Sequence, residues 1–254
     1  TIPAAGSETS DSAVLTNAES GEKRGLNTDL NRPVFAILDP VLAATLPNHQ
    51  VACGVSDILM HTMDRYFNPL DNELTDAIAE ALLRTVVANG AKAVKDTHDY
   101  DAMSEVMWCG SVSHNGLTGL GGQGDFAPHQ LGHELSAMFD IAHGASLSAV
   151  WGQWARYVYQ NRIERFVRFA KNVWNITEGS DEEIALAGIQ ATVDYFKSIG
   201  VPTCFSEAAE IGVQSEEVLR DLTDRCTFHG ARTIGTVQVL DGDDIYNIYQ
   251  ASNV

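Results

Sequence analysis

Apolar residues recur at spacings of three and four over most of the chain, a pattern that predicts amphipathic helices. The clearest helix begins at Ser180, which forms a capping box with Glu183, and ends at Gly200. The apolar stripe of this helix is formed by Leu186, Ile189, Val193 and Phe196. Three other helices are predicted by similar stripes: Ile78, Leu82 and Val86; Leu219, Leu222 and Cys226; and Ile245, Ile248 and Tyr249.

The first forty residues have a different pattern. Residues 13–16 and 33–39 read as short strands separated by Gly, Asn and Ser turns, and a third strand is expected near residues 23–26. After Asp39-Pro40 the strand signals almost vanish. The sequence therefore predicts a mainly α fold, with a β-rich segment at 1–40 followed by an all-helical bundle of about eight to ten helices at 41–254.

Composition excludes several classes of protein. Of the 254 residues, 44% are hydrophobic and 20% are charged, as in soluble globular proteins, and no apolar run approaches a membrane span. The net charge of −18 disfavours nucleic-acid binding. The start of the chain lacks the pattern of a secretory signal, and the four cysteines lie far apart, so we expect reduced thiols and a cytoplasmic protein.

Five residues carry the candidate chemistry. Asp57 and His61 stand four apart in a helix predicted over 51–67, and His129 and His133 repeat this spacing in a second helix. His143 begins the next helix. One acid and several neutral imidazoles suit Fe²⁺ or Zn²⁺. Because five candidates exceed the four ligands of a typical zinc site, either one histidine is not a ligand or a fifth group works beside an open metal position.

Taken singly, these pairs are weak signals. A histidine pair on one helix face is more often a surface or core feature than a metal site, and His133-Glu134 fails as a zincin motif because position 137 is Ala137. We interpret the four remaining histidines, His49, His98, His114 and His229, as structural. We interpret Trp151 and Trp154 as core side chains in preference to walls of a substrate pocket.

Longer motifs surround the five residues in a fixed order. They are Thr1-Ile2-Pro3-Ala4-Ala5-Gly6-Ser7-Glu8, Leu38-Asp39-Pro40, Gly54-Val55-Ser56-Asp57-Ile58-Leu59-Met60-His61, Gly132-His133-Glu134-Leu135-Ser136-Ala137-Met138, Asp140-Ile141-Ala142-His143-Gly144 and Trp174-Asn175-Ile176-Thr177-Glu178-Gly179. Together they resemble the iron-containing alcohol dehydrogenase family, especially its NADPH-dependent aldehyde reductases and butanol dehydrogenases.

The resemblance implies the dehydroquinate synthase-like fold of that family, in which a helical metal-binding domain follows a Rossmann-like domain. It implies hydride transfer between NADP(H), or less favourably NAD(H), and a small alcohol or aldehyde, in a homodimer. Asp57, His61, His129 and His143 correspond to the metal ligands, and His133 to the catalytic histidine beside the nicotinamide. The further dinucleotide contacts would be Thr1, Ser10, Lys23, Leu42 and Thr45.

The chain departs from the family in one respect. The glycine-rich pyrophosphate loop is absent, and Gly121-Gly122-Gln123-Gly124 has the wrong spacing to replace it. We therefore expect residues 1–40 to be a remnant of the dinucleotide domain, and the chain to be a fragment lacking most of that domain. The alternatives are a metal-binding helical domain that is inactive alone, or a metal-dependent hydrolase.

Overall fold

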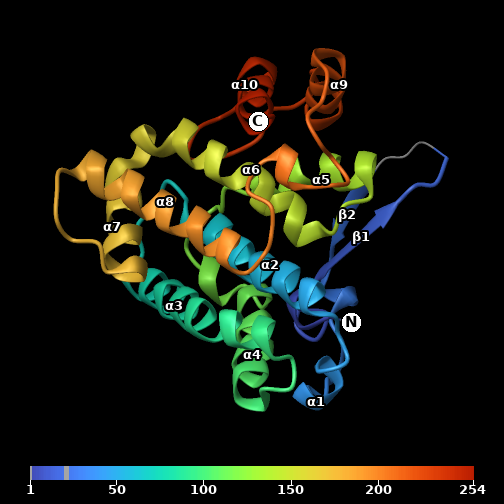
Figure 1. The fold of residues 1–254 in the computed structure, drawn as a ribbon, viewed down its shortest axis with the longest axis vertical. Coiled ribbons are helices and arrows are strands. Elements are labelled where there is room, and N and C mark those ends of the chain that lie inside the picture. Colours follow the sequence, from blue (N-terminus) through green and yellow to red (C-terminus); the bar gives the residue numbers. More distant parts are fainter. Residues whose placement is uncertain (1, 20–22) are drawn as a thin grey trace.

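Helices make up most of the regular structure in the computed structural model, which describes residues 2–19 and 23–254 (Figure 1). The α-helices are α1 (Pro40–Ala43), α2 (Asn48–Tyr66), α3 (Glu73–Lys95), α4 (Tyr100–His114), α5 (Ala127–Phe139), α6 (His143–Val158), α7 (Ile163–Trp174), α8 (Asp181–Ser198), α9 (Glu216–Cys226) and α10 (Gly242–Ser252). Short 3-10 turns are η1 (Pro3–Ala5), η2 (Asp29–Asn31), η3 (Leu117–Gly119), η4 (Tyr159–Arg162) and η5 (Phe205–Glu207). The mainly α prediction is confirmed.

Helix α2 lies at the centre of the bundle. Most of its residues are buried, and it packs against α3, α4, α5 and α6. Helices α7 and α8 pack together on one side, and α9 and α10 lie side by side at the opposite end from α3 and α4 (Figure 1). A side chain on α2 can therefore meet residues from several other helices.

Local signals fix where several helices begin. The predicted capping box forms at α8, where the Ser180 hydroxyl accepts the Glu183 N–H and the Glu183 carboxylate accepts the Ser180 N–H. Asp241 and Asp244 form a second capping box at α10. These bonds satisfy backbone donors that a helix start leaves free.

A buried ion-pair network joins α7 to the central helices. The Arg165 guanidinium is 1% exposed and donates to both carboxylate oxygens of Asp76 and to the Tyr66 carbonyl. The Tyr66 hydroxyl donates to Glu80. Because every member has a partner, the network holds α2, α3 and α7 in one register.

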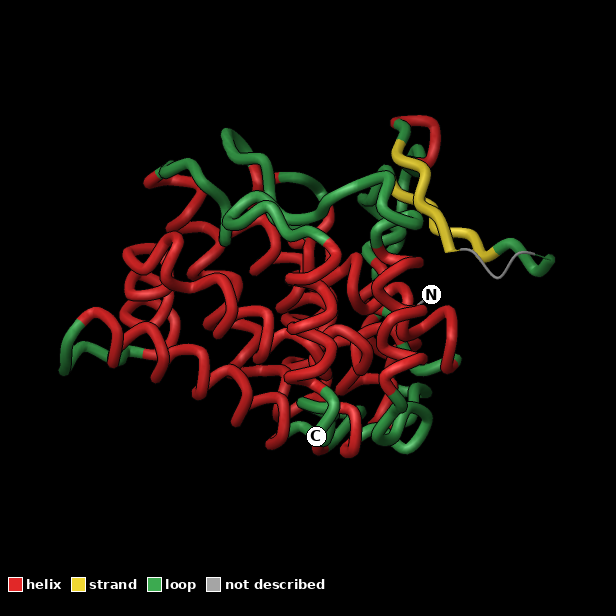
Figure 2. Tube along the Cα trace, turned by 90° about the horizontal axis from the view of Figure 1, so that it is seen from above, coloured by secondary structure: helices red, strands yellow, loops and turns green. Residues whose placement is uncertain are grey.

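The two described strands form one antiparallel hairpin. Strand β1 (Ser12–Thr16) pairs with β2 (Lys23–Asn27), so that Ser12 lies opposite Asn27 and Thr16 opposite Lys23. The strands predicted at 13–16 and 23–26 are thus confirmed. Figure 2 shows the hairpin projecting from the helical body.

The strand predicted at 33–39 is wrong. This segment has no strand partner among the described residues, and Val34, Phe35 and Ile37 are 101%, 79% and 86% exposed. A strand needs a neighbouring edge that accepts its backbone hydrogen bonds. Apolar residues that favour strands are therefore not sufficient here, and without a neighbouring strand the segment is irregular.

The prediction that Trp151 and Trp154 are core side chains is confirmed. Trp151 and Trp154 are fully buried in the core, and all four cysteines are free thiols. None of the described helices combines the length and the apolar character that crossing a membrane requires.

Candidate metal centre

Four donor atoms from three helices converge beside α2. They are Oδ1 of Asp57 and Nε2 of His61, His129 and His143, and the four residues offer ligand atoms that all lie within 4.8 Å of one another. Asp57 and His61 come from α2, His129 from α5 and His143 from α6. The structure thus brings together the four residues for which the resemblance implied metal binding.

The spacing of these atoms matches the size of a metal site. Asp57 Oδ1 lies 3.6 Å from Nε2 of His61, 3.8 Å from that of His129 and 3.6 Å from that of His143. The Nε2 atoms of His61 and His129 are 3.2 Å apart. Two ligands placed 2.0–2.1 Å from a tetrahedral ion lie ~3.3 Å from each other.

The start of α5 is fixed by Asp125. The Asp125 carboxylate accepts the N–H groups of Ala127, Thr236 and Val237. Pro128 occupies the first turn, where its missing N–H leaves no helical bond unmade. His129 follows at once and is directed toward α2.

A very close helix contact places His143. The Ser56 hydroxyl of α2 donates to the Gly144 carbonyl at 2.9 Å, and a Cβ on Gly144 would lie 1.9 Å from the Cys53 carbonyl oxygen. Only glycine allows this approach. Gly132 has a similar role on α5, since its Cβ would come within 2.6 Å of Leu147. The close neighbour of Gly132 is thus α6.

Burial and nearby charges give three of these four side chains the protonation state that binds a metal ion. Burial alone would raise the pKa of Asp57, but His143 and His129 outweigh it and lower that pKa. Burial lowers the pKa of His143 to about 4 and that of His61 well below its usual value. Both imidazoles are therefore neutral at pH 7, the form that binds metals.

His129 differs from the other two imidazoles. Burial would lower its pKa, but the carboxylates of Asp64 and Asp57 outweigh burial and raise the pKa to about 9. Metal binding at neutral pH would therefore displace a proton from His129.

The donor set fits a divalent cation. Asp57 Oδ1 is buried, has no hydrogen-bond partner among the described residues and faces three ring nitrogens. A buried carboxylate oxygen without a partner is costly, and an ion bound between it and the imidazoles would remove that cost.

His133 lies next to this cluster but is not one of the four converging groups. Its ring stacks against His143 with centroids 5.3 Å apart, and it lies 6.0 Å from the His129 ring. Burial, followed by the charges of His143 and His129, lowers the pKa of His133 to about 2. The geometry separates the five sequence candidates into four converging donors and one neutral neighbour.

The positions expected to contact a dinucleotide are scattered. Leu42 and Thr45 line a hollow of about 710 Å³ that also includes Pro3 and Leu38. Lys23 is close enough to Asp57 for that charge to raise its pKa, although burial has the larger effect and lowers it. Ser10 is buried and accepts the Ser12 N–H, which indicates a local turn. Thr1 lies outside the described residues.

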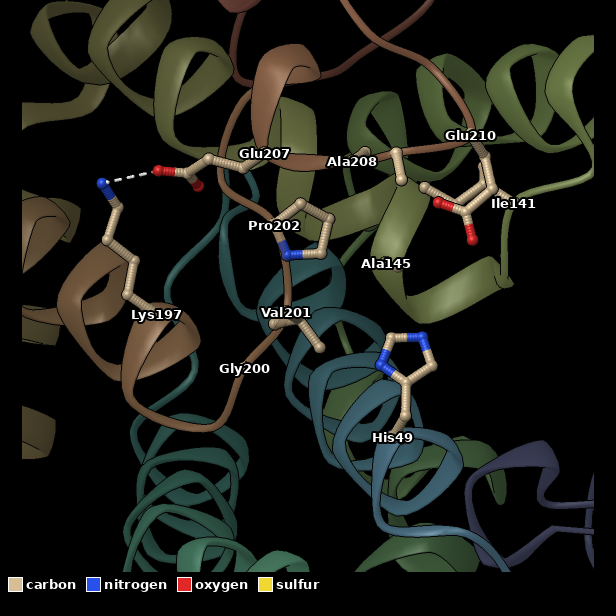
Figure 3. Close-up of a pocket in the computed structure, with 11 residues that line it drawn as sticks. His49, Ile141, Ala145, Lys197, Gly200, Val201, Pro202, Glu207, Ala208 and Glu210 are labelled. Carbon is tan, nitrogen blue, oxygen red and sulfur yellow. Dashed lines mark ion pairs between the residues drawn. The ribbon is translucent and has the colours of Figure 1, made fainter.

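A second hollow lies beside the cluster without joining it. It has a volume of about 550 Å³ and is lined by His49 and by Ile141 and Ala145, which flank His143 (Figure 3). The Lys197–Glu207 ion pair, at 3.0 Å, crosses its rim. None of the four converging residues lines it, so it is separate from the candidate metal centre.

Two neighbours of the cluster escaped the sequence interpretation. The Asp64 carboxylate is hydrogen-bonded to His129. The ring of His114, which the sequence led us to interpret only as structural, has its centroid 3.8 Å from that of His61. Asp64 could have been found, because Asp57, His61 and Asp64 follow the i, i+4, i+7 spacing of one helix face. No sequence signal links His114, at the end of α4, to the site.

The chain matches the profile of a known protein family. The sequence profile of the Fe-containing alcohol dehydrogenase family, C-terminal part, matches residues 50–253. The chain belongs to the Fe-containing alcohol dehydrogenase family. The resemblance in the motifs around Asp57, His133 and His143 is thereby confirmed.

Individual members of this family are similar along nearly all of the chain. It is 36% identical to NADH-dependent butanol dehydrogenase A of Clostridium acetobutylicum, covering 99% of this chain and 64% of that protein. It is 38% identical to the NADPH-dependent aldehyde reductase YqhD of Escherichia coli, with the same coverage. The chain therefore spans a little under two thirds of the length of these family members.

A solved structure supports the fold. The crystal structure of an NADH-dependent butanol dehydrogenase A from Thermotoga maritima superposes with a TM-score of 0.93 at 31% identity, over 100% of this chain and 65% of that one. The arrangement of helices that builds the candidate metal centre is therefore the family arrangement.

Proposed function

We propose that this chain forms the metal-binding part of an enzyme that interconverts a small aldehyde and its alcohol with NAD(P)H. Support comes from its family and from relatives named as butanol dehydrogenase and aldehyde reductase. The observation that carries the proposal is the convergence of Asp57, His61, His129 and His143.

In this proposal the four residues hold Fe²⁺ or Zn²⁺, and a bound ion supplies Lewis-acid polarisation of the substrate carbonyl. The side chain of His143 is 31% exposed, whereas those of Asp57 and His129 are 9% and 5% exposed. Substrate would approach from the His143 side, because His143 is the most exposed of the four side chains.

His133 lies on that same side and is neutral. A neutral imidazole has one donor and one acceptor nitrogen. We propose that His133 lies beside the nicotinamide and hydrogen-bonds the substrate oxygen, so that it can pass on the proton that completes the alcohol.

The dinucleotide would reach the site along the N-terminal segment. Lys23 is near Asp57, and Leu42 and Thr45 line one hollow, which supports their assignment to cofactor contacts. Among the relatives both NADH and NADPH appear in the names, and we propose NADPH as the first cofactor to test. The homodimer stays a prediction.

The exposed apolar side chains at 33–42 support the proposal that this part of the chain contacts a dinucleotide-binding domain. Contiguous apolar surface of this kind typically marks an interface. We propose that residues 1–40 belong with a dinucleotide-binding domain, whose sheet would pair with the segment 33–39, and that residues 41–254 form the helical domain.

The metal assignment has a direct test. The double variant Asp57→Ala/His129→Ala should lose bound iron or zinc almost completely in elemental analysis, because it removes two of four ligands. The matched control His98→Ala/Asp101→Ala removes the same residue types from exposed positions and should keep the parent metal content. Equal metal content in both variants would refute the assignment.

The reaction is tested separately. Aldehyde-dependent loss of NADPH absorbance should be measured with this chain and with a longer chain that includes a dinucleotide-binding domain. Turnover by the longer chain alone would indicate a metal-binding domain inactive by itself. Ester or amide hydrolysis without nucleotide would instead support the hydrolase alternative.

A further inference from the structure

Asp64 is a fully buried acid on α2, seven residues after Asp57. Its side chain is 0% exposed, and its Oδ2 atom is hydrogen-bonded to Nδ1 of His129. The Asp64 carbonyl also accepts the Asp125 N–H at 2.6 Å. Asp64 therefore joins α2 to α5 through both its side chain and its backbone.

The bond to Asp64 determines how His129 presents its other nitrogen. A carboxylate accepts hydrogen bonds, so it holds the ring proton on Nδ1. Once the ring is neutral, the free electron pair is on Nε2, which lies 3.2 Å from His61 Nε2 and 3.8 Å from Asp57 Oδ1. A carboxylate behind a coordinating imidazole fixes the ring orientation and makes the other nitrogen more basic.

The other two imidazoles of the cluster have no such support. Nδ1 of His61 faces the Arg65 guanidinium at 3.3 Å, and Nδ1 of His143 is buried without a hydrogen-bond partner in the part of the chain that the structure describes. Within those residues, His129 alone among the three is held from behind by an acid.

A role in stability alone explains Asp64 poorly. Its second oxygen, Oδ1, is buried and has no hydrogen-bond partner among the described residues. Leaving a buried carboxylate oxygen without a partner costs folding free energy. Such a cost is typical of a group retained for the chemistry of a site.

We propose that Asp64 is a positioning residue of the metal centre, which acts through His129 to orient the ring and strengthen its bond to the ion. This inference rests on the proposed metal-binding function. It makes Asp64 a determinant of metal affinity without direct contact to metal or substrate.

The experiment compares metal affinity with stability in Asp64→Asn and in Asp76→Asn. Asp76 on α3 is a similarly buried acid, but its carboxylate pairs with Arg165 and lies outside the cluster of four converging residues. Zinc affinity is measured by competition with a chromogenic chelator, and Tm is measured on the metal-free proteins. We expect Asp64→Asn to weaken zinc binding about 10- to 100-fold. Asp76→Asn should lower Tm while its zinc affinity stays within about threefold of the parent.

A second pair of variants covers the case in which Asp64→Asn does not fold. Asp64→Glu and Asp64→Gln have the same length and differ only in the carboxylate, and the Glu variant should bind zinc at least about tenfold more tightly. If Asp64→Asn binds zinc as tightly as the parent, or if the Glu and Gln variants bind zinc equally, the role of Asp64 is overturned and the proposed metal site is not. A parent chain that binds no zinc overturns the proposed function as well.

Discussion

The histidines of the cluster have different charge states because their neighbours differ. Burial lowers the pKa of His133 to about 2 and that of His143 to about 4, whereas Asp64 and Asp57 raise that of His129 to about 9. The unfolded chain binds protons at each histidine near pH 6.5. The folded and unfolded states therefore bind different numbers of protons, and stability must depend on pH.

The direction of this dependence follows from the sign of each shift. For His133 and His143 the folded pKa is depressed, so their contribution is present above pH 6.5 and is lost as the pH falls below it. For His129 the folded pKa is raised, so its contribution is present below pH 6.5 and is lost as the pH rises through 9.

His133→Gln should isolate one of these contributions. Below pH 6.5 the parent loses stability at His133 by up to about 1.4 kcal/mol per pH unit, and the variant does not. Urea unfolding of the metal-free proteins at pH 7, 6 and 5 measures the difference. His98→Gln is the exposed control. A parent-to-variant difference that stays constant from pH 7 to 5 would contradict the buried, neutral state of His133.

At the scale of single residues, the sequence predicted the cluster well but not its supports. Regular helix spacing indicated Asp57 with His61 and His129 with His133, since residues four apart share a helix face. The same spacing places Asp64 on the face of Asp57 and His61, so that this support could have been found. It could not show that His133 is excluded from the converging set, or that His114 lies against it, because those facts depend on how helices cross.

The crossing of α2 and α6 is the element-level feature on which the site depends. Gly144→Ala would place a methyl group 1.9 Å from the Cys53 carbonyl oxygen, so the start of α6 must move away. We expect a loss of about 1–3 kcal/mol in unfolding free energy and a marked loss of zinc affinity, because His143 moves with the helix.

Gly242→Ala on α10 is the matched control for that substitution. Its added Cβ would meet nothing closer than Thr223 Cγ2 at 3.8 Å, so its stability should stay within about 1 kcal/mol of the parent. Gly144→Ala with parent-like stability and zinc affinity would show that the close crossing is not needed.

Element boundaries were predictable where a local signal set them. The start of α8 followed from Ser180 with Glu183, and α6 begins at His143 as predicted. Asp140, with a φ of 54°, forms the turn before it. Helix α4 was not predicted, because its Ser, Gly and Cys residues blur the apolar spacing. The prediction of a strand at 33–39 failed for another reason, because the neighbouring strand with which a segment pairs cannot be read from that segment alone.

At the scale of the whole molecule, apolar burial is uneven. The helical body encloses a continuous core that includes Phe166 at 0% exposure, whereas Val34, Phe35 and Ile37 are almost fully exposed. The stability of this chain should therefore come from the helical body, with little from the N-terminal segment.

A comparison of two variants tests this division. The triple variant Val34→Thr/Phe35→Ser/Ile37→Thr should keep an unfolding free energy within about 0.5 kcal/mol of the parent, as exposed substitutions do. Phe166→Ala should lose about 3–5 kcal/mol, because it opens a cavity in the core. Urea unfolding measures both. A triple variant that loses more than about 2 kcal/mol would mean that the segment packs against the body.

The most direct test of the account is to locate a metal ion by anomalous X-ray diffraction from crystals of the chain grown with zinc. The account predicts one strong anomalous peak per chain, about 2.0–2.2 Å from Oδ1 of Asp57 and from Nε2 of His61, His129 and His143. No peak between these four atoms, or a peak bound elsewhere on the chain, would contradict it.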